Sequence, residues 1–265
     1  MLITDTSVDG ALLTWNTVRR SLRLQPVTRD PELERIGALH VKYMGKHGLG
    51  HPEDKSAADY TADGNKAGMG SVLSFGRPNA REAILGLLDT FYHRVQMLQP
   101  DLAVTGINYE DRYGAANVHN GPKRKVSWTE PFAYPPDGAI HVRPGWSGME
   151  GPSPIPEVPK GGVGQTVTLT FPSGKKVKNG TIVLHEGGAS GPSPDAWVSA
   201  PDKPAAGGAG MFPNNMNSIC LIAKAPLKTG TLYVAEATAE VDGRPFKQTW
   251  SFTTDKGGGP RPPRR

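Results

Sequence analysis

The first hundred residues carry apolar side chains at the spacing of helices. Apolar residues recur every three or four positions over residues 9–24, which predicts a helix capped by Ser7 or Asp9. A second helix is expected after the cap residue Asp30, because Pro31 follows it at the first helical position. The apolar face of this second helix comprises Leu33, Ile36, Leu39, His40, Tyr43 and Met44.

Glycines and polar residues then interrupt the helical pattern. The second helix is expected to end at Gly45 or Gly48, since glycine commonly terminates helices. A third helix is expected from near Asn79, and residues 102–109 are expected to form a buried strand. Residues 48–78 are rich in glycine and polar residues, so they predict a long loop of the kind that often carries function.

Beyond residue 131 the apolar positions alternate with a period of two, which is typical of strands. One strand is expected over residues 167–171, and two more over residues 233–241 and 248–254 on either side of an Asp242-Gly243 turn. Asn179-Gly180 predicts a hairpin turn, although it also begins a glycosylation sequon. Short strands separated by glycine and proline favour a β-sandwich.

Two other features of this half are expected to be structural. Residues 219–222 form a short apolar strand in which Cys220 is expected to be a buried thiol. The segment Ala205–Asn217 is rich in glycine and asparagine, so it predicts a long loop that is either a spacer or a contact surface.

Composition supports two domains and excludes several classes of protein. The chain has 265 residues, and most of its 33 glycines and 25 prolines lie after residue 125. A single cysteine excludes an internal disulfide and a cysteine-rich zinc module. No apolar run of about 18 residues is present, so no membrane span is predicted. The N-terminus also lacks the charged and apolar segments of a signal peptide.

The net charge of +5 does not indicate a nucleic-acid partner. Four basic residues and no acidic ones lie in the last ten residues, which leaves the rest of the chain nearly neutral. Residues 255–265 are therefore expected to be a disordered basic tail. A second basic run, Gly121–Lys125, lies within the expected linker His119–Glu130.

The residues with candidate chemistry in the first half are His51, Glu53 and His93. In an extended segment His51 and Glu53 would face one cleft, because residues i and i+2 point to the same side. With His93 they form a set suited to a divalent metal or to proton transfer, or else a purely structural cluster. His40 lies on an apolar helix face, so it is expected to be a core histidine.

The order of five short motifs resembles the bacterial branch of the CAP superfamily, which includes cysteine-rich secretory proteins, antigen 5 and pathogenesis-related proteins. The motifs are Asn16-x-x-Arg19, Asp30-Pro-x-Leu33 with Leu39-His40-x-x-Tyr43-Met44, His51-x-Glu53, Tyr92-His93-Arg94, and Val104-x-Gly106-Ile-Asn-Tyr109. The resemblance covers about residues 8–125 and implies an α-β-α sandwich with a central cleft. It also implies that Tyr43, His51, Glu53, His93 and Arg94 line that cleft.

The resemblance further implies that His51 and His93 are metal ligands, for zinc or another divalent cation. However, the family's Gly-Glu-Asn stretch is replaced by Gly68-Met69-Gly70-Ser71, and its His-Tyr-Thr-Gln segment is missing. The four-residue metal set of the family is therefore incomplete in this chain, and the resemblance alone assigns no enzymatic activity.

Residues 131–254 resemble bacterial Ig-like domains, through Tyr134-Pro-Pro-Asp-Gly138, Pro226-Leu227-x-x-Gly230-Thr-x-Tyr233 and Trp250-x-Phe252-Thr-Thr254. The expected fold class is thus α+β, with a CAP-type sandwich at 8–125 followed by an Ig-like sandwich. Together the two resemblances imply an exported, non-enzymatic protein of the cell surface or exterior, which binds a small ligand or a cell-surface partner. The alternative is a metal-dependent hydrolase that uses the same cleft.

Overall fold

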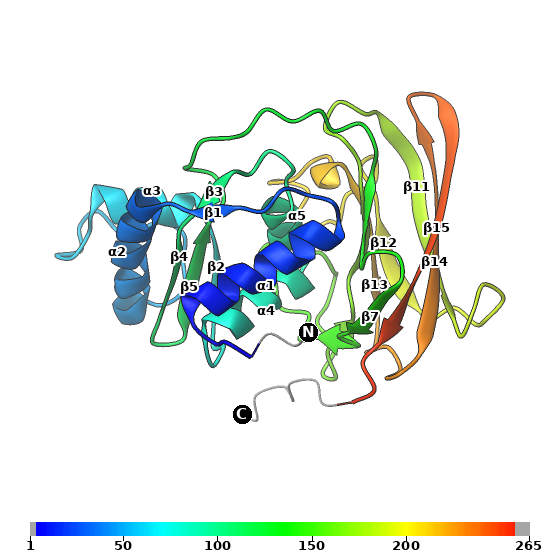
Figure 1. The fold of residues 1–265 in the computed structure, drawn as a ribbon, viewed down its shortest axis with the longest axis horizontal. Coiled ribbons are helices and arrows are strands. Elements are labelled where there is room, and N and C mark those ends of the chain that lie inside the picture. The colour runs from blue at the N-terminus through cyan, green and yellow to red at the C-terminus, as the bar shows by residue number, and fades with distance from the viewer. Residues whose placement is uncertain (1–3, 258–265) are drawn as a thin grey trace. The chain divides into compact units, whose positions relative to one another are not determined.

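The computed structural model describes residues 4–257, and these divide into two compact units (Figure 1). The first unit comprises residues 1–88 and 93–127, and the second comprises residues 89–92 and 128–265. The change of unit after Ser127 lies within the segment expected to be a linker. Most of the expected basic tail, residues 258–265, lies outside the described residues.

The first unit is built from five helices and five short strands among its described residues, and the last helix begins at Tyr92, which is assigned to the second unit. Its helices are α1 (Val8–Ser21), α2 (Pro31–His47), α3 (Ala62–Met69), α4 (Ala80–Asp89) and α5 (Tyr92–Met97). Its strands are β1 (Thr28–Arg29), β2 (Ser71–Phe75), β3 (Val104–Thr105), β4 (Ile107–Glu110) and β5 (Tyr113–Asn117), and β1 pairs with β3 in parallel. In addition, Leu102 and Lys123 form an isolated antiparallel bridge.

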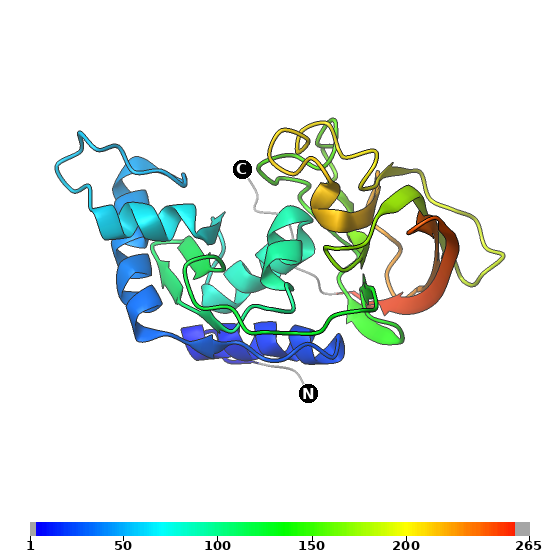
Figure 2. The ribbon, with the colours of Figure 1, turned by 90° about the horizontal axis from the view of Figure 1, so that it is seen from above.

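Helices cover both faces of the antiparallel sheet β2-β5-β4 (Figures 1 and 2). On one face, Val41 and Met44 of α2 pack against Leu73 and Ala115. On the other face, α4 lies over Gly114 and the neighbouring residues of β2 and β4. This arrangement is the expected α-β-α sandwich.

The local signals for α2 are confirmed. Asp30 caps the helix by accepting hydrogen bonds from the backbone N–H groups of Glu32 and Leu33 at 2.9 and 3.0 Å. The helix continues through Gly45 and ends at Gly48, whose φ of 89° suits a residue without a side chain. Of the expected apolar face, all but Leu39 are fully buried.

The prediction of a loop over residues 48–78 is wrong in its second half. That segment contains α3 and β2, and β2 pairs with β5 over its whole length. Gly64 and Gly68 made α3 look unlike a helix, since glycine is unfavourable inside helices. The first helix also ends earlier than expected, at Ser21, and Ser7 rather than Asp9 caps it.

The described part of the second unit is all-β apart from a short 3₁₀ turn and the helix start at Tyr92. Its strands are β6 (Phe132–Tyr134), β7 (Ala139–Val142), β8 (Gly145–Trp146), β9 (Val163–Gly164), β10 (Val167–Thr170), β11 (Val177–Glu186), β12 (Ala196–Ser199), β13 (Ser218–Ala223), β14 (Leu232–Val241) and β15 (Arg244–Thr254). The 3₁₀ turn, Asn215–Asn217, ends the long loop that the sequence predicts.

Two four-stranded sheets share one hydrophobic core in this unit. Their strand orders are β12-β13-β10-β6 and β11-β14-β15-β7. Leu169 and Leu221 contribute to the core from the first sheet, and Leu184 and Trp250 from the second. The Asp242-Gly243 turn is confirmed, with φ of 51° and 78°, and it joins the longest antiparallel pair, β14 and β15.

The hairpin expected at Asn179-Gly180 is not formed. Residues 177–186 instead make one continuous strand, β11, which pairs with β14 on both sides of these two residues. The register shifts between Lys178 and Thr181, so the pair forms a β-bulge, with Asn179 at φ 52°. Cys220 is confirmed as a buried thiol, with 2% of its surface exposed.

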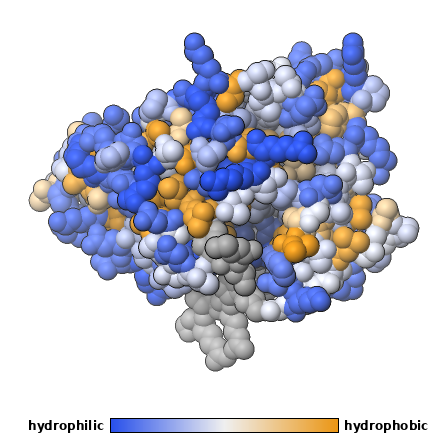
Figure 3. All heavy atoms as spheres, viewed as in Figure 1, coloured by the Kyte–Doolittle hydropathy of each residue, from blue (hydrophilic) through white to orange (hydrophobic). Residues whose placement is uncertain are grey.

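The surface gives no indication of a membrane span. Within residues 4–257, no helix is both long and apolar enough to cross a bilayer. On the face shown in Figure 3, hydrophilic residues surround small groups of hydrophobic ones.

Candidate functional site

The first unit contains a buried histidine–glutamate pair that the sequence did not predict. His40 of α2 and Glu53 of the following loop meet at 3.1 Å between Nδ1 and Oε1. Their side chains are 0% and 1% exposed. Such a buried polar pair is stable only when its hydrogen-bonding groups are satisfied, so each remaining contact matters.

The hydrogen bonds of this pair fix where its protons are. His40 Nε2 lies 3.0 Å from the Gly50 carbonyl oxygen, and because a carbonyl only accepts, Nε2 donates. Glu53 Oε2 accepts the backbone N–H of Thr61 at 3.0 Å. The contact between Nδ1 and Oε1 therefore holds one proton, and both carboxylate oxygens are already engaged.

Two glycines of α3 allow the pair to be enclosed. A side chain at Gly64 would lie 2.4 Å from Glu53 Oε1, and one at Gly68 would lie 2.4 Å from the imidazole Cε1 of His40. Asn65 of the same helix accepts the backbone N–H of Glu53. The glycines that weaken α3 as an isolated helix are thus required for its close approach to the pair.

His51 lies beside this pair but is exposed. Its Nδ1 is 2.9 Å from the Gly68 carbonyl, so it donates there and leaves Nε2 as the ring's second nitrogen. The expectation that His51 and Glu53 face one cleft does not hold for their side chains. The chain bends at residues 51 and 52, and Glu53 turns inward to His40.

Tyr43 and His47 hold the loop after Glu53 against α2. The Tyr43 hydroxyl accepts the backbone N–H of Asp54 at 2.9 Å, and its ring stacks on His47 with centroids 4.1 Å apart. His47 Nε2 contacts Asp59 at 2.9 Å, and Lys46 contacts the other oxygen of Asp59 at 3.0 Å. Tyr43 is 7% exposed, so it supports the loop from below.

These contacts predict a stability change in acid. Hydrogen bonds from His47 and Lys46 lower the pKa of Asp59 to about 2. A carboxyl with a lowered pKa stabilises the fold above its ordinary pKa and loses that contribution as the pH falls through the lowered value. Asp59→Asn should therefore be less stable than wild type in urea at about pH 5, and the difference should be clearly smaller at about pH 2. The same difference at both pH values would contradict this.

The remaining predicted site residues lie in α5 and differ in exposure. His93 is half-buried in the first turn of that helix. Arg94 is 0% exposed, and its Nη1 donates to the Leu88 carbonyl at 3.1 Å. Arg94 is thus placed to hold the end of α4, and its ligand-binding role stays a prediction.

The donor set does not fit a metal centre with three or more protein ligands. Among residues 4–257, no group of three histidine, cysteine, aspartate or glutamate side chains is arranged to hold one ion. Glu53 is occupied by His40 and Thr61, so it is not available to His51. The two-histidine site at His51 and His93 stays a prediction.

The sequence contained part of the signal for the buried pair. His40 was correctly expected in the core, because it lies on the apolar face of α2. Its partner Glu53 lies 13 positions further along the chain, beyond the end of α2, and no regular spacing links the two residues. The other sign of a close contact in the sequence is the pair of glycines, Gly64 and Gly68, in one short segment.

Comparison with known proteins finds a family match within the first unit. Residues 13–118 match the CAP, or cysteine-rich secretory protein, family. One similar solved structure is the 1.5 Å crystal structure of an extracellular protein containing an SCP domain from Bacillus anthracis strain Ames, at 18% identity and a TM-score of 0.36. The match covers 44% of this chain and 41% of that one, so this chain spans less than half of that protein. No curated protein matches the sequence.

Proposed function

We propose that this protein, which carries a CAP domain at residues 13–118, is a non-enzymatic binding protein of the cell exterior or surface. The observation that supports this most is the enclosed pair of His40 and Glu53. A general base must reach the proton that it removes. The Glu53 carboxylate is 1% exposed and fully hydrogen-bonded, so it is poorly placed for that task.

In this proposal His51 is the predicted site residue that contacts a ligand. It is exposed, and the bond to Gly68 fixes its ring. Two apolar side chains close to it in sequence are also exposed. Leu49, two residues before His51, is 54% exposed, and Met69, directly after Gly68, is 59% exposed. An exposed imidazole near two apolar side chains suits a small ligand or a partner surface. Tyr43, His40 and Glu53 act by positioning the loop that carries His51.

A hydrolysis assay tests this proposal against the alternative enzyme. Wild type and His51→Ala should both hydrolyse p-nitrophenyl acetate and casein at the background rate, with or without added zinc. Calorimetric titration of zinc should give the same heat with wild type, with His51→Ala and with His93→Ala. Zinc-dependent turnover that His51→Ala removes would establish the hydrolase instead.

We also propose that the second unit is an Ig-like domain. An Ig domain places strands A, B, E and D in one sheet and C, F and G in the other. If β6, β10, β11, β12, β13, β14 and β15 are labelled A to G along the chain, the first sheet contains A, B, E and D, and the second contains C, F and G with β7 added beside β15. The chain lacks the disulfide of antibody domains, because Cys220 is its only cysteine.

A tyrosine at the start of β14 supports the same proposal. Ig-like sandwiches often carry a tyrosine near the start of strand F whose hydroxyl bonds to the backbone a few residues upstream. Tyr233 is the second residue of β14, and its hydroxyl accepts the backbone N–H of Lys228 at 2.9 Å. Burial raises the pKa of Tyr233, as expected for an enclosed phenol.

Tyr233→Phe should lower the free energy of unfolding by about 1 kcal/mol, because one partly buried hydrogen bond is lost while the ring still packs. Urea unfolding followed by tryptophan fluorescence measures this difference. Tyr134→Phe provides a tyrosine control at the first strand of the same unit. If Tyr233→Phe were as stable as wild type, the hydrogen bond between Lys228 and the Tyr233 hydroxyl would not stabilise the fold.

Export rests on the description of the matched family, and the state of the single cysteine is compatible with it. The matched family is described as secretory, and the comparison structure is described as extracellular. A location outside the cell is also compatible with the single cysteine. Cys220 is buried and has no second cysteine in the chain to pair with, so an oxidising environment would not form an internal disulfide. Fractionation of cells that express the native gene, with detection of this protein in the medium or envelope, tests the location.

A further inference from the structure

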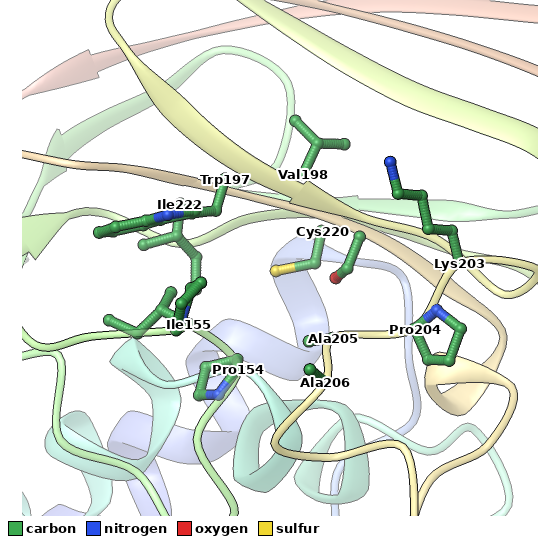
Figure 4. A pocket seen from close by; sticks show the side chains of 12 residues that line it. Pro154, Ile155, Trp197, Val198, Lys203, Pro204, Ala205, Ala206, Cys220 and Ile222 are labelled. Atoms are coloured by element: carbon green, nitrogen blue, oxygen red, sulfur yellow. The ribbon is translucent and has the colours of Figure 1, made fainter.

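The second unit contains a cavity of about 190 Å³ that the proposed function does not use (Figure 4). It lies against strands β12 and β13, on the face turned away from the core shared by the two sheets. Its floor and walls come from these two strands and from two loops, at residues 154–156 and 203–206.

Strand register explains the floor of the cavity. Trp197 pairs with Ile222, and Ser199 pairs with Cys220, so these four side chains lie on one face of the two strands. The alternate residues, such as Leu221, point into the hydrophobic core. All six residues of β13 are buried for this reason: the core covers one face and the two loops cover the other.

Local hydrogen bonds and one close approach of the backbone hold the two loops in place. The first loop is stiffened at Ser153, whose hydroxyl donates to the Ile155 carbonyl at 2.7 Å. The second loop is closed by two backbone hydrogen bonds between Ala200 and Lys203, at 2.9 and 3.0 Å. Gly207 joins the loops, because a side chain there would lie 2.3 Å from the Ser153 carbonyl. The cavity is thus formed before any ligand arrives.

The lining combines apolar surface with positive charge. Trp197, Ile155 and Ile222 gather on one side of the cavity, and Lys203 lies across from them (Figure 4). Lys203 is the only charged residue in the lining. A second cation, Lys224, has its Nζ 5.8 Å from the centre of the Trp197 ring. No carboxylate lines the cavity to neutralise Lys203.

We propose that this cavity binds an aromatic carboxylate. Its ring packs against Trp197 and the two isoleucines, and its carboxylate pairs with the Lys203 ammonium. The size is suitable, since an engineered apolar cavity of about 150 Å³ holds benzene. Two kinds of ligand combine an aromatic ring with a carboxylate in this way: a free aromatic acid, and the C-terminus of a peptide that ends in phenylalanine.

Methyl NMR spectroscopy of the full chain tests the proposal with both kinds of ligand. Phenylacetate, or the peptide N-acetyl-Ala-Ala-Phe, should shift the methyl signals of Ile155 and Ile222. The methyl signals of Ile36 and Ile84, which lie in the core of the first unit, should stay in place. Tighter binding of phenylacetate identifies a free acid as the ligand, and tighter binding of the peptide identifies a C-terminus. No shift of Ile155 and Ile222 with either probe would overturn the proposal.

Ligand charge and two substitutions test the roles of the lining residues. Phenethylammonium, which carries a cation in place of the carboxylate, should bind at least about fivefold more weakly than phenylacetate. Lys203→Met should weaken phenylacetate binding about fivefold, and Trp197→Leu about tenfold. Lys178→Met, an exposed control outside the cavity, should bind as wild type does. Equal binding of the acid and the amine by wild type would refute the role of Lys203.

Discussion

Glu53→Ala should lower the free energy of unfolding by about 3 kcal/mol, the cost of removing one partner from a buried hydrogen-bonded pair and leaving a space in its place. The substitution leaves His40 Nδ1 and the Thr61 N–H without their partner in a region closed to water. It also leaves a space beside Gly64, which packs directly on the carboxylate. Urea unfolding followed by circular dichroism measures the change.

Asp54→Ala is the matched control for this prediction. Asp54 is the next residue and is exposed, and its side chain accepts hydrogen bonds from the backbone and the hydroxyl of Ser56. Its removal should cost about 1 kcal/mol or less. Glu53→Gln keeps the shape and should fall between the two. Equal stabilities of Glu53→Ala and Asp54→Ala would mean that the carboxylate does not stabilise the loop.

Arg19→Leu is the second substitution with a large expected effect, a loss of about 3 kcal/mol. Arg19 is 0% exposed and lies in the Asn16-x-x-Arg19 motif. Its guanidinium donates to four backbone carbonyls, those of Gln25, Met97, Gln99 and Leu102, at 2.8–3.4 Å. Leucine would remove all four hydrogen bonds, although the Met97 carbonyl still accepts from the Trp15 indole and the Gln99 carbonyl from the Leu102 N–H.

Burial and, to a smaller extent, the nearby Arg124 lower the pKa of Arg19 to about 10, so the side chain is still charged at neutral pH. Arg20→Leu, on the exposed side of the same helix, is the control and should change stability by less than about 0.5 kcal/mol. Thermal unfolding at neutral pH compares the two variants. If they had the same transition temperature, the four hydrogen bonds of Arg19 would not stabilise the fold.

Local signals predicted the elements whose ends are encoded by neighbouring residues. Asp30 and Pro31 mark the start of α2 because a cap and a proline act within one turn. The turn at Asp242-Gly243 was predictable for the same reason, since its geometry requires residues that tolerate positive φ. Each of these effects depends on two or three adjacent residues.

Elements shaped by distant contacts were not predictable. Helix α3 has glycines where its propensity calls for other residues, and the structure explains them by the approach of Glu53 and His40. Asn179-Gly180 has the composition of a hairpin turn, yet β14 pairs with both flanks and turns it into a bulge. In both cases a partner far along the chain decides the outcome.

The same reason limited the prediction of the candidate site. His51 and Glu53 were grouped by their spacing, which assumes an extended segment. The chain bends there instead, so one side chain is exposed and the other is buried against α2. Spacing along the chain identified the right loop, but only the packing of α2 and α3 shows which side chain is accessible.

A double-mutant cycle between His40 and Glu53 tests the central claim most directly, namely that Glu53 is held by His40 and is not available for catalysis. The cycle compares the free energies of unfolding of wild type, His40→Ala, Glu53→Ala and the double variant. A buried, hydrogen-bonded pair predicts a coupling energy of about 2 kcal/mol or more. A coupling energy of about 0.5 kcal/mol or less would contradict the claim, because the two side chains would then stabilise the protein independently.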